Sequence, residues 1–76
     1  METDRGFLYT MIRRVASCDP RSDDIGMFLE VLADNLAEGR REHAFLRDCR
    51  LCDVGVIRRP RYTELRYYMW CQPDAD

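Results

Sequence analysis

The sequence has no lysine and few of the residues that mark unusual architectures. All 12 basic side chains of the 76-residue chain are arginine, and it has one histidine, one tryptophan, four glycines and three prolines. No apolar run approaches the roughly 18 residues of a membrane-spanning helix, and no apolar signal core follows the charged start. These absences predict an intracellular, cytoplasmic protein without a membrane partner.

Length and composition predict one folded domain over residues 1–76. The chain is 46% hydrophobic and 34% charged, which is ordinary for a globular domain and argues against disorder. It is too short for an enzyme with its own cofactor domain. Glycine-rich phosphate loops, paired-carboxylate motifs and the His-Glu-x-x-His pattern are also missing. We therefore expect no enzymatic activity.

The charges are unevenly distributed along the chain. Residues 1–39 contain four arginines and eight acidic residues, whereas residues 40–66 contain eight arginines and four acidic residues, within a net charge of −2. This asymmetry predicts either a basic surface on an acidic body or mutual attraction of the two halves. The use of arginine alone fits either a coding bias or selection for planar, bidentate guanidinium contacts.

Hydrophobic periodicity predicts two helices in the first half of the chain. The apolar residues between Phe7 and Val15 fall within an arc of about 140° on a helical wheel, which predicts a helix over about 4–17. A second helix is predicted over about 23–38, with Ser22 as its N-cap and Gly39 as its stop.

A third helix is predicted over about 40–52. Phe45, Cys49 and Cys52 would lie on one face of it. Four basic side chains would form a stripe on the opposite face: Arg40, His43, Arg47 and Arg50. We expect this stripe to be exposed.

The remaining segment, about 54–71, predicts a β-hairpin. Its residues alternate and are rich in aromatic and β-branched types, and Pro60 lies in a basic loop between the two strands. The alternative is a fourth helix over 60–71, which would give an all-α four-helix domain. The expected fold class is mainly α with a C-terminal β-hairpin.

Three short motifs carry a resemblance to a known family. They are Leu32-Ala33-Asp34-Asn35-Leu36, then Val54-Gly55-Val56-Ile57-Arg58-Arg59, and then Leu65-Arg66-Tyr67-Tyr68. Over residues 25–70 this pattern resembles the winged helix-turn-helix DNA-binding domains. The resemblance implies a winged-helix-like fold.

The resemblance also implies a function, that of a small transcriptional regulator. The 40–51 helix would read double-stranded DNA and the 58–61 loop would form the wing. Monomer affinity would be modest, which favours a homodimer or a further partner. The predicted DNA- or partner-binding residues are Arg40, His43, Arg47, Arg50, Arg58, Arg59, Arg61 and Arg66.

A protein partner is the alternative. The acidic total and the small size suit a non-enzymatic adaptor, or an inhibitor of a host protein of the kind that phages encode. Such a protein would use the arginine face or the strand with Tyr67, Tyr68 and Trp70. Because alternate residues of a strand face opposite ways, Tyr68 and Trp70 cannot share a core with Tyr67, which leaves an aromatic pair for a partner. The simpler alternative is that these aromatics close the core of a small domain.

The four cysteines complete the candidate sites. Without a secretory signal, we expect reduced thiols or metal ligands rather than disulfides. A zinc site would use Cys49, Cys52, Cys71 and His43. Cys49 and Cys52 also fit an apolar face as buried thiols, in which case no cofactor is needed.

Overall fold

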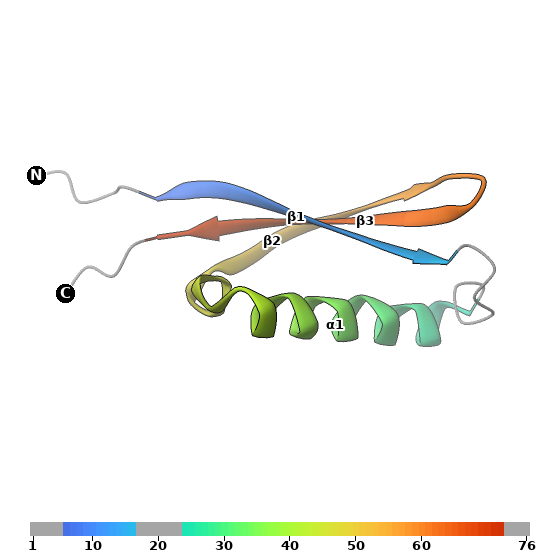
Figure 1. Ribbon diagram of the computed structural model, residues 1–76, viewed down its shortest axis with the longest axis horizontal. Coiled ribbons are helices and arrows are strands. Elements are labelled where there is room, and N and C mark those ends of the chain that lie inside the picture. Colours follow the sequence, from blue (N-terminus) through green and yellow to red (C-terminus); the bar gives the residue numbers. More distant parts are fainter. Residues whose placement is uncertain (1–5, 17–23, 73–76) are drawn as a thin grey trace, which may run out of the picture.

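A computed structural model of the chain describes residues 6–16 and 24–72. Its elements, in order, are β1 (Phe7–Ala16), α1 (Ile25–Glu42), the 3-10 helix η2 (Ala44–Asp48), β2 (Arg50–Arg58) and β3 (Tyr62–Cys71). One α-helix lies on one face of a three-stranded antiparallel sheet (Figure 1). The expected mainly α, winged-helix-like fold is therefore wrong, and so is the all-α alternative.

The sheet has β3 at its centre. β1 and β2 each pair with β3 in antiparallel fashion, so they run parallel to each other at the two edges. The predicted C-terminal hairpin is confirmed as β2 and β3, although β2 begins at Arg50 rather than near 54.

The segment predicted as the first helix is strand β1. It is paired with β3 along its whole length, from Phe7 opposite Cys71 to Ala16 opposite Tyr62. Aromatic and β-branched residues favour the extended conformation here. The apolar residues that formed a helical arc lie on both faces of the strand, with Met11 facing α1 and Ile12 facing away.

Helix α1 confirms the predicted second helix but has different ends. Its N-cap is Asp24, whose side chain accepts a hydrogen bond from the Met27 N–H at 3.0 Å, and Ser22 lies outside the described residues. The helix continues past Gly39 to Glu42. Gly39 is buried against Met11, and a Cβ atom would collide with the Met11 side chain, so this glycine permits close packing rather than ending the helix. No helix of the described residues is long and apolar enough to cross a membrane.

The predicted third helix, about 40–52, is also wrong. The chain leaves α1 at His43, whose N–H donates to the Gly39 carbonyl at 2.9 Å, then forms η2 and enters β2. Leu46 and Cys49 are buried, which directs this segment back onto the sheet instead of along a helix axis. Phe45 is half exposed and packs edge-on against Tyr9, with the two ring centroids 5.2 Å apart.

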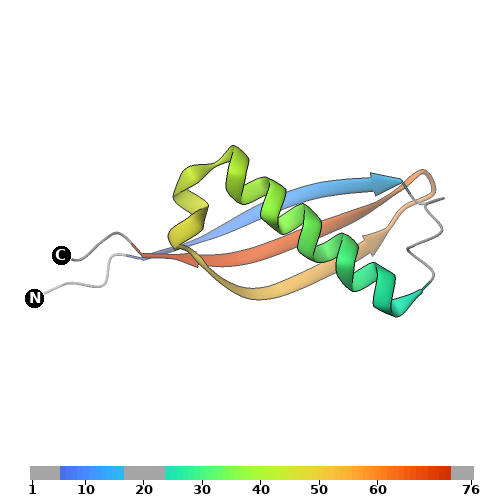
Figure 2. The same cartoon turned by 90° about the horizontal axis from the view of Figure 1, so that it is seen from below.

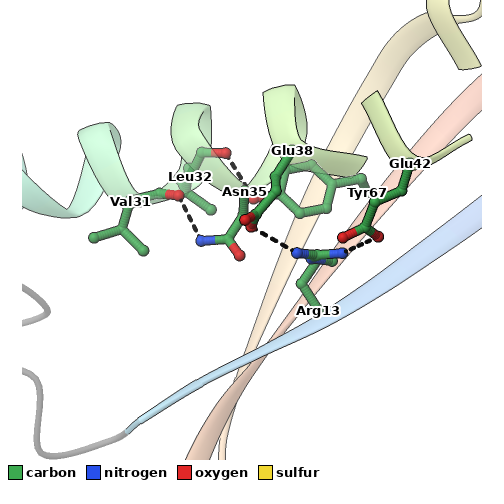
Figure 3. Close-up of polar contacts among 7 residues, drawn as sticks. All are labelled: Arg13, Val31, Leu32, Asn35, Glu38, Glu42 and Tyr67. Carbon is green, nitrogen blue, oxygen red and sulfur yellow. Dashed lines mark hydrogen bonds and ion pairs between the residues drawn. The ribbon is translucent and has the colours of Figure 1, made fainter. Parts of the chain in front are cut away.

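Helix α1 crosses the sheet diagonally, from β2 at its N-terminus to β1 at its C-terminus (Figure 2). The Arg13 guanidinium of β1 donates to Glu38 and Glu42 at 2.8 and 2.9 Å (Figure 3). The Tyr67 hydroxyl of β3 donates to the Leu32 carbonyl at 2.7 Å, and burial raises the pKa of Tyr67 to about 12. The core between helix and sheet contains Met11, Val31, Leu46, Cys49, Leu65, Tyr67, Met69 and Cys71.

A disulfide joins Cys49 to Cys71. The antiparallel register places Arg50 of β2 opposite Trp70 of β3. Cys49, which precedes Arg50, therefore lies opposite Cys71, which follows Trp70. The expectation of reduced thiols is wrong for this pair, and the zinc set with Cys52 and His43 is not assembled, because oxidised cysteines are not thiolate ligands. Cys52 is a free, exposed cysteine, and within residues 6–16 and 24–72 no three potential ligands converge.

Candidate nucleic-acid interface

The sheet face opposite α1, here called the open face, is not covered by any other described element (Figures 1 and 2). Strand alternation and register define its residues, because side chains two apart share a face. Its centre is formed by the even-numbered residues of β3. The open face consists of Leu8, Thr10, Ile12, Arg14 and Ala16 from β1, Tyr62, Glu64, Arg66, Tyr68 and Trp70 from β3, and Arg50, Asp53, Gly55 and Ile57 from β2.

The open face carries exposed apolar side chains among its charged ones. Leu8 and Ile12 are 58% and 51% exposed, and Ile57 is partly exposed. An antiparallel sheet with one solvated face normally alternates apolar and polar residues, so that the solvated face is polar. Apolar side chains gathered on an uncovered face are typical of binding surfaces.

Two aromatic rings of the central strand rest on glycines near the edges of the open face. The Trp70 indole lies on Gly6, where a Cβ atom would collide with the ring. The Tyr68 ring leans toward β2 and lies 3.5 Å from where a Cβ of Gly55 would be. The missing Cβ of Gly6 lets the Trp70 ring lie against the backbone, whereas a side chain at Gly55 would meet Tyr68 only at ordinary contact distance, and each ring is partly exposed.

Arginine side chains lie among these rings. The Arg14 guanidinium is 4.9 Å from the centroid of the Tyr62 ring, within cation–π distance. Arg66 donates to Glu64 at 2.6 Å, and the neighbouring Tyr68 side chain adds to the effect of Glu64 in raising the pKa of Arg66. The register places the exposed Arg50 opposite Trp70.

Glu64 is the buried acid of the open face and its charge is neutralised. The hydrogen bond from Arg66 lowers the pKa of Glu64, and the positive charges of Arg66, Arg59 and Arg14 lower it further, against the opposing effect of burial. The carboxylate is therefore ionised at neutral pH and compensates part of the arginine charge. The surrounding guanidiniums leave the open face and its turn with an excess of positive charge.

The acidic residues of α1 lie in the other layer of the molecule. Residues four apart share one side of a helix, and four exposed carboxylates follow this spacing. They are Glu30, Asp34, Glu38 and Glu42. The two layers therefore carry opposite charge, acidic on the helix and basic on the open face.

The structure brings four of the predicted site residues to the open face or its end. Arg50 and Arg66 lie on the face itself. Arg59 and Arg61 are exposed in the turn between β2 and β3, and Arg59 is close enough to Glu64 to affect its pKa.

The other four predicted residues lie elsewhere. Arg40 donates to the Cys49 carbonyl at 3.0 Å and joins α1 to the start of β2. His43 and Arg47 are exposed near the end of α1 and in η2. Arg58 faces α1, with its guanidinium 6.0 Å from the Phe28 ring. The predicted basic stripe of a recognition helix is therefore absent from this part of the chain.

Sequence reasoning missed Arg14 and the apolar residues of β1 as members of a surface. Treating 7–16 as a helix placed them around an axis rather than on one side of a strand. The alternation of Leu8, Thr10, Ile12 and Arg14 was the available signal. Tyr68 and Trp70 were correctly separated from the buried Tyr67 by strand alternation.

No family model matches the chain, and neither does any curated protein or solved structure. The candidate site therefore rests on its own geometry. Partly exposed aromatic rings can stack on planar ligands, and guanidiniums between them can bind phosphate.

Proposed function

We propose that this protein is a non-enzymatic binding module that holds single-stranded nucleic acid on the open face of its sheet. The observation that carries the proposal is the placement of Tyr68 and Trp70 on the central strand of an uncovered sheet, with Arg14, Arg50 and Arg66 around them. Sheets that bind single strands use this combination of aromatic platform and basic residues.

Stacking supports a single-stranded ligand rather than a duplex. A base can stack on Tyr68 or Trp70 only if it is free of its own neighbours, which unpaired nucleotides allow. The distribution of charge supports the same ligand, because the acidic stripe of α1 lies in the opposite layer and the basic turn extends the open face. The helix over 40–51 that would read a major groove is absent, so this mode of duplex recognition is not retained.

A fluorescence titration tests the proposal directly, because Trp70 is the only tryptophan. A ten-nucleotide oligouridylate or oligothymidylate at low salt should quench Trp70 emission in a saturable way. If about three phosphates are contacted, the logarithm of the association constant should fall with the logarithm of the salt concentration, with a slope of about −2. A duplex of equal length should bind more weakly than either single strand.

Matched variants separate stacking from charge. Tyr68→Leu should weaken binding about tenfold through the lost base stack. Arg50→Gln should weaken binding and flatten the salt dependence, whereas Arg41→Gln, an exposed arginine on α1, should change neither. Absence of quenching at low salt, or tighter binding of the duplex, would show the proposal to be wrong.

A further inference from the structure

The two edges of the sheet differ in how they are protected from pairing with another chain. β2 is interrupted by a register shift between Leu51 and Asp53 and contains Gly55, features that make its edge less regular for strand addition. β1 pairs with β3 without any register shift over all ten residues and contains neither proline nor glycine. Its outer edge has the regularity that an added strand requires.

A shallow hollow of about 500 Å³ lies at this edge and is lined by Ile12, Arg13 and Arg14. Successive side chains of a strand point to opposite faces, so a hollow bounded by three consecutive residues follows the strand edge rather than one face. An extended segment lying beside β1 would occupy this position.

Charge indicates what kind of segment fits. β1 contains two arginines and no acidic residue. Arg13 is already held by Glu38 and Glu42, whereas Arg14 contacts the Tyr62 ring and forms no ion pair with a described carboxylate. The arginine of this edge that is outside the described ion pairs therefore lies on the open-face side, opposite Glu64 and two residues from the half-exposed Ile12.

We propose that the outer edge of β1 binds an extended acidic peptide segment as a fourth strand. Backbone hydrogen bonds to β1 supply the pairing, and two side chains of the segment supply selectivity. An acidic side chain lies beside Arg14 and an apolar side chain, two residues away, lies beside Ile12. This partner uses the edge of the sheet, so the proposal does not depend on nucleic-acid binding by the open face.

Amide hydrogen exchange of the full chain, measured by NMR, tests this proposal. The probe is an eight-residue peptide of alternating threonine and valine, so that all its valines lie on one face. Two valines that are two residues apart are replaced, one by isoleucine and the other by glutamate. Peptide addition should slow exchange at least tenfold at every second amide of β1 and leave the amides of β2 unchanged. No slowing in β1, or slowing in β2 instead, overturns the proposal.

Controls test whether the acidic side chain selects the peptide and whether a second copy of the chain occupies the edge instead. A peptide with lysine in place of glutamate should bind at least tenfold more weakly, and Arg14→Gln should remove most of this difference. A free protein that is already dimeric by light scattering, with alternate β1 amides protected, would assign the edge to a second copy and overturn the peptide proposal. Oligouridylate should quench Trp70 without protecting β1, so failure of one proposal is distinguishable from failure of the other.

Discussion

The two faces of the sheet are built from the same three strands but differ in what their side chains contact. Leu65 and Tyr67, which point toward α1, are 0% and 1% exposed, whereas Leu8 and Ile12 on the open face are more than half exposed. Both faces contain apolar residues, so hydropathy does not distinguish them. Their difference indicates that apolar residues under α1 stabilise the fold, while those on the open face are available to a ligand.

The largest effect should come from truncating a side chain on the sheet face that α1 covers, here called the covered face. Leu65→Ala removes a fully buried side chain from the core and should lower the free energy of unfolding by about 3–4 kcal/mol. Ile12→Ala, on the open face, should lower it by less than about 1 kcal/mol because half of that side chain is already exposed. Urea denaturation followed by circular dichroism measures both, and equal losses would remove the distinction between the faces.

The next effect concerns the disulfide, which belongs to the covered face. Replacing Cys49 and Cys71 together with alanine releases a loop closed over a sequence separation of 22 and should cost about 3 kcal/mol of unfolding free energy. Cys52→Ser serves as the control, because this cysteine is exposed and unpaired. If the control destabilises the protein as much as the double variant does, the disulfide is not a determinant of stability.

The smallest effect is a pH dependence confined to the open face. The folded-state pKa of Glu64 is below its ordinary value of 4.5, so its ion pair with Arg66 stabilises the fold above about pH 4.5 and is lost as pH falls below it. Melting temperatures between pH 6 and pH 3 should decline less steeply in Glu64→Gln than in the parent chain. Glu30→Gln, an exposed glutamate of α1, should keep the parent slope, and identical slopes in all three chains would contradict the assignment.

The C-terminal hairpin and the main helix could be predicted from the sequence, because each has a clear local pattern. Strict alternation in β3 places Tyr67 and Met69 inward and Tyr68 and Trp70 outward. The apolar face of α1, with Phe28, Leu32 and Leu36, follows a helical period. Both signals depend on near neighbours in the chain.

Strand β1 could not be predicted from periodicity, and the reason also bears on function. Leu8 and Ile12 face the open side while Tyr9 and Met11 face the core, so apolar residues occupy both faces and the two-residue period is obscured. The property that misdirects secondary-structure assignment, apolar side chains on an uncovered face, is the same property that identifies the surface as a candidate site.

The segment around residues 40–52 was mispredicted because its structure depends on distant contacts. Cys49 is fixed by its disulfide to Cys71, and Leu46 is buried in the core, so tertiary packing ends the helix at Glu42. With the helix ended there, the basic residues that followed a helical spacing are distributed over different elements. Local spacing carries no information about such pairings.

The diagonal course of α1 has a mechanical consequence. Along its length the helix approaches β2 through Phe28 and Arg58, then bonds β3 through the Leu32 carbonyl, and finally engages β1 through Glu38 and Glu42. Shear of any strand against its neighbour would break one of these attachments. The backbone positions that carry the rings and guanidiniums on the far side are thereby fixed, which would reduce the ordering entropy lost if the proposed ligand binds there.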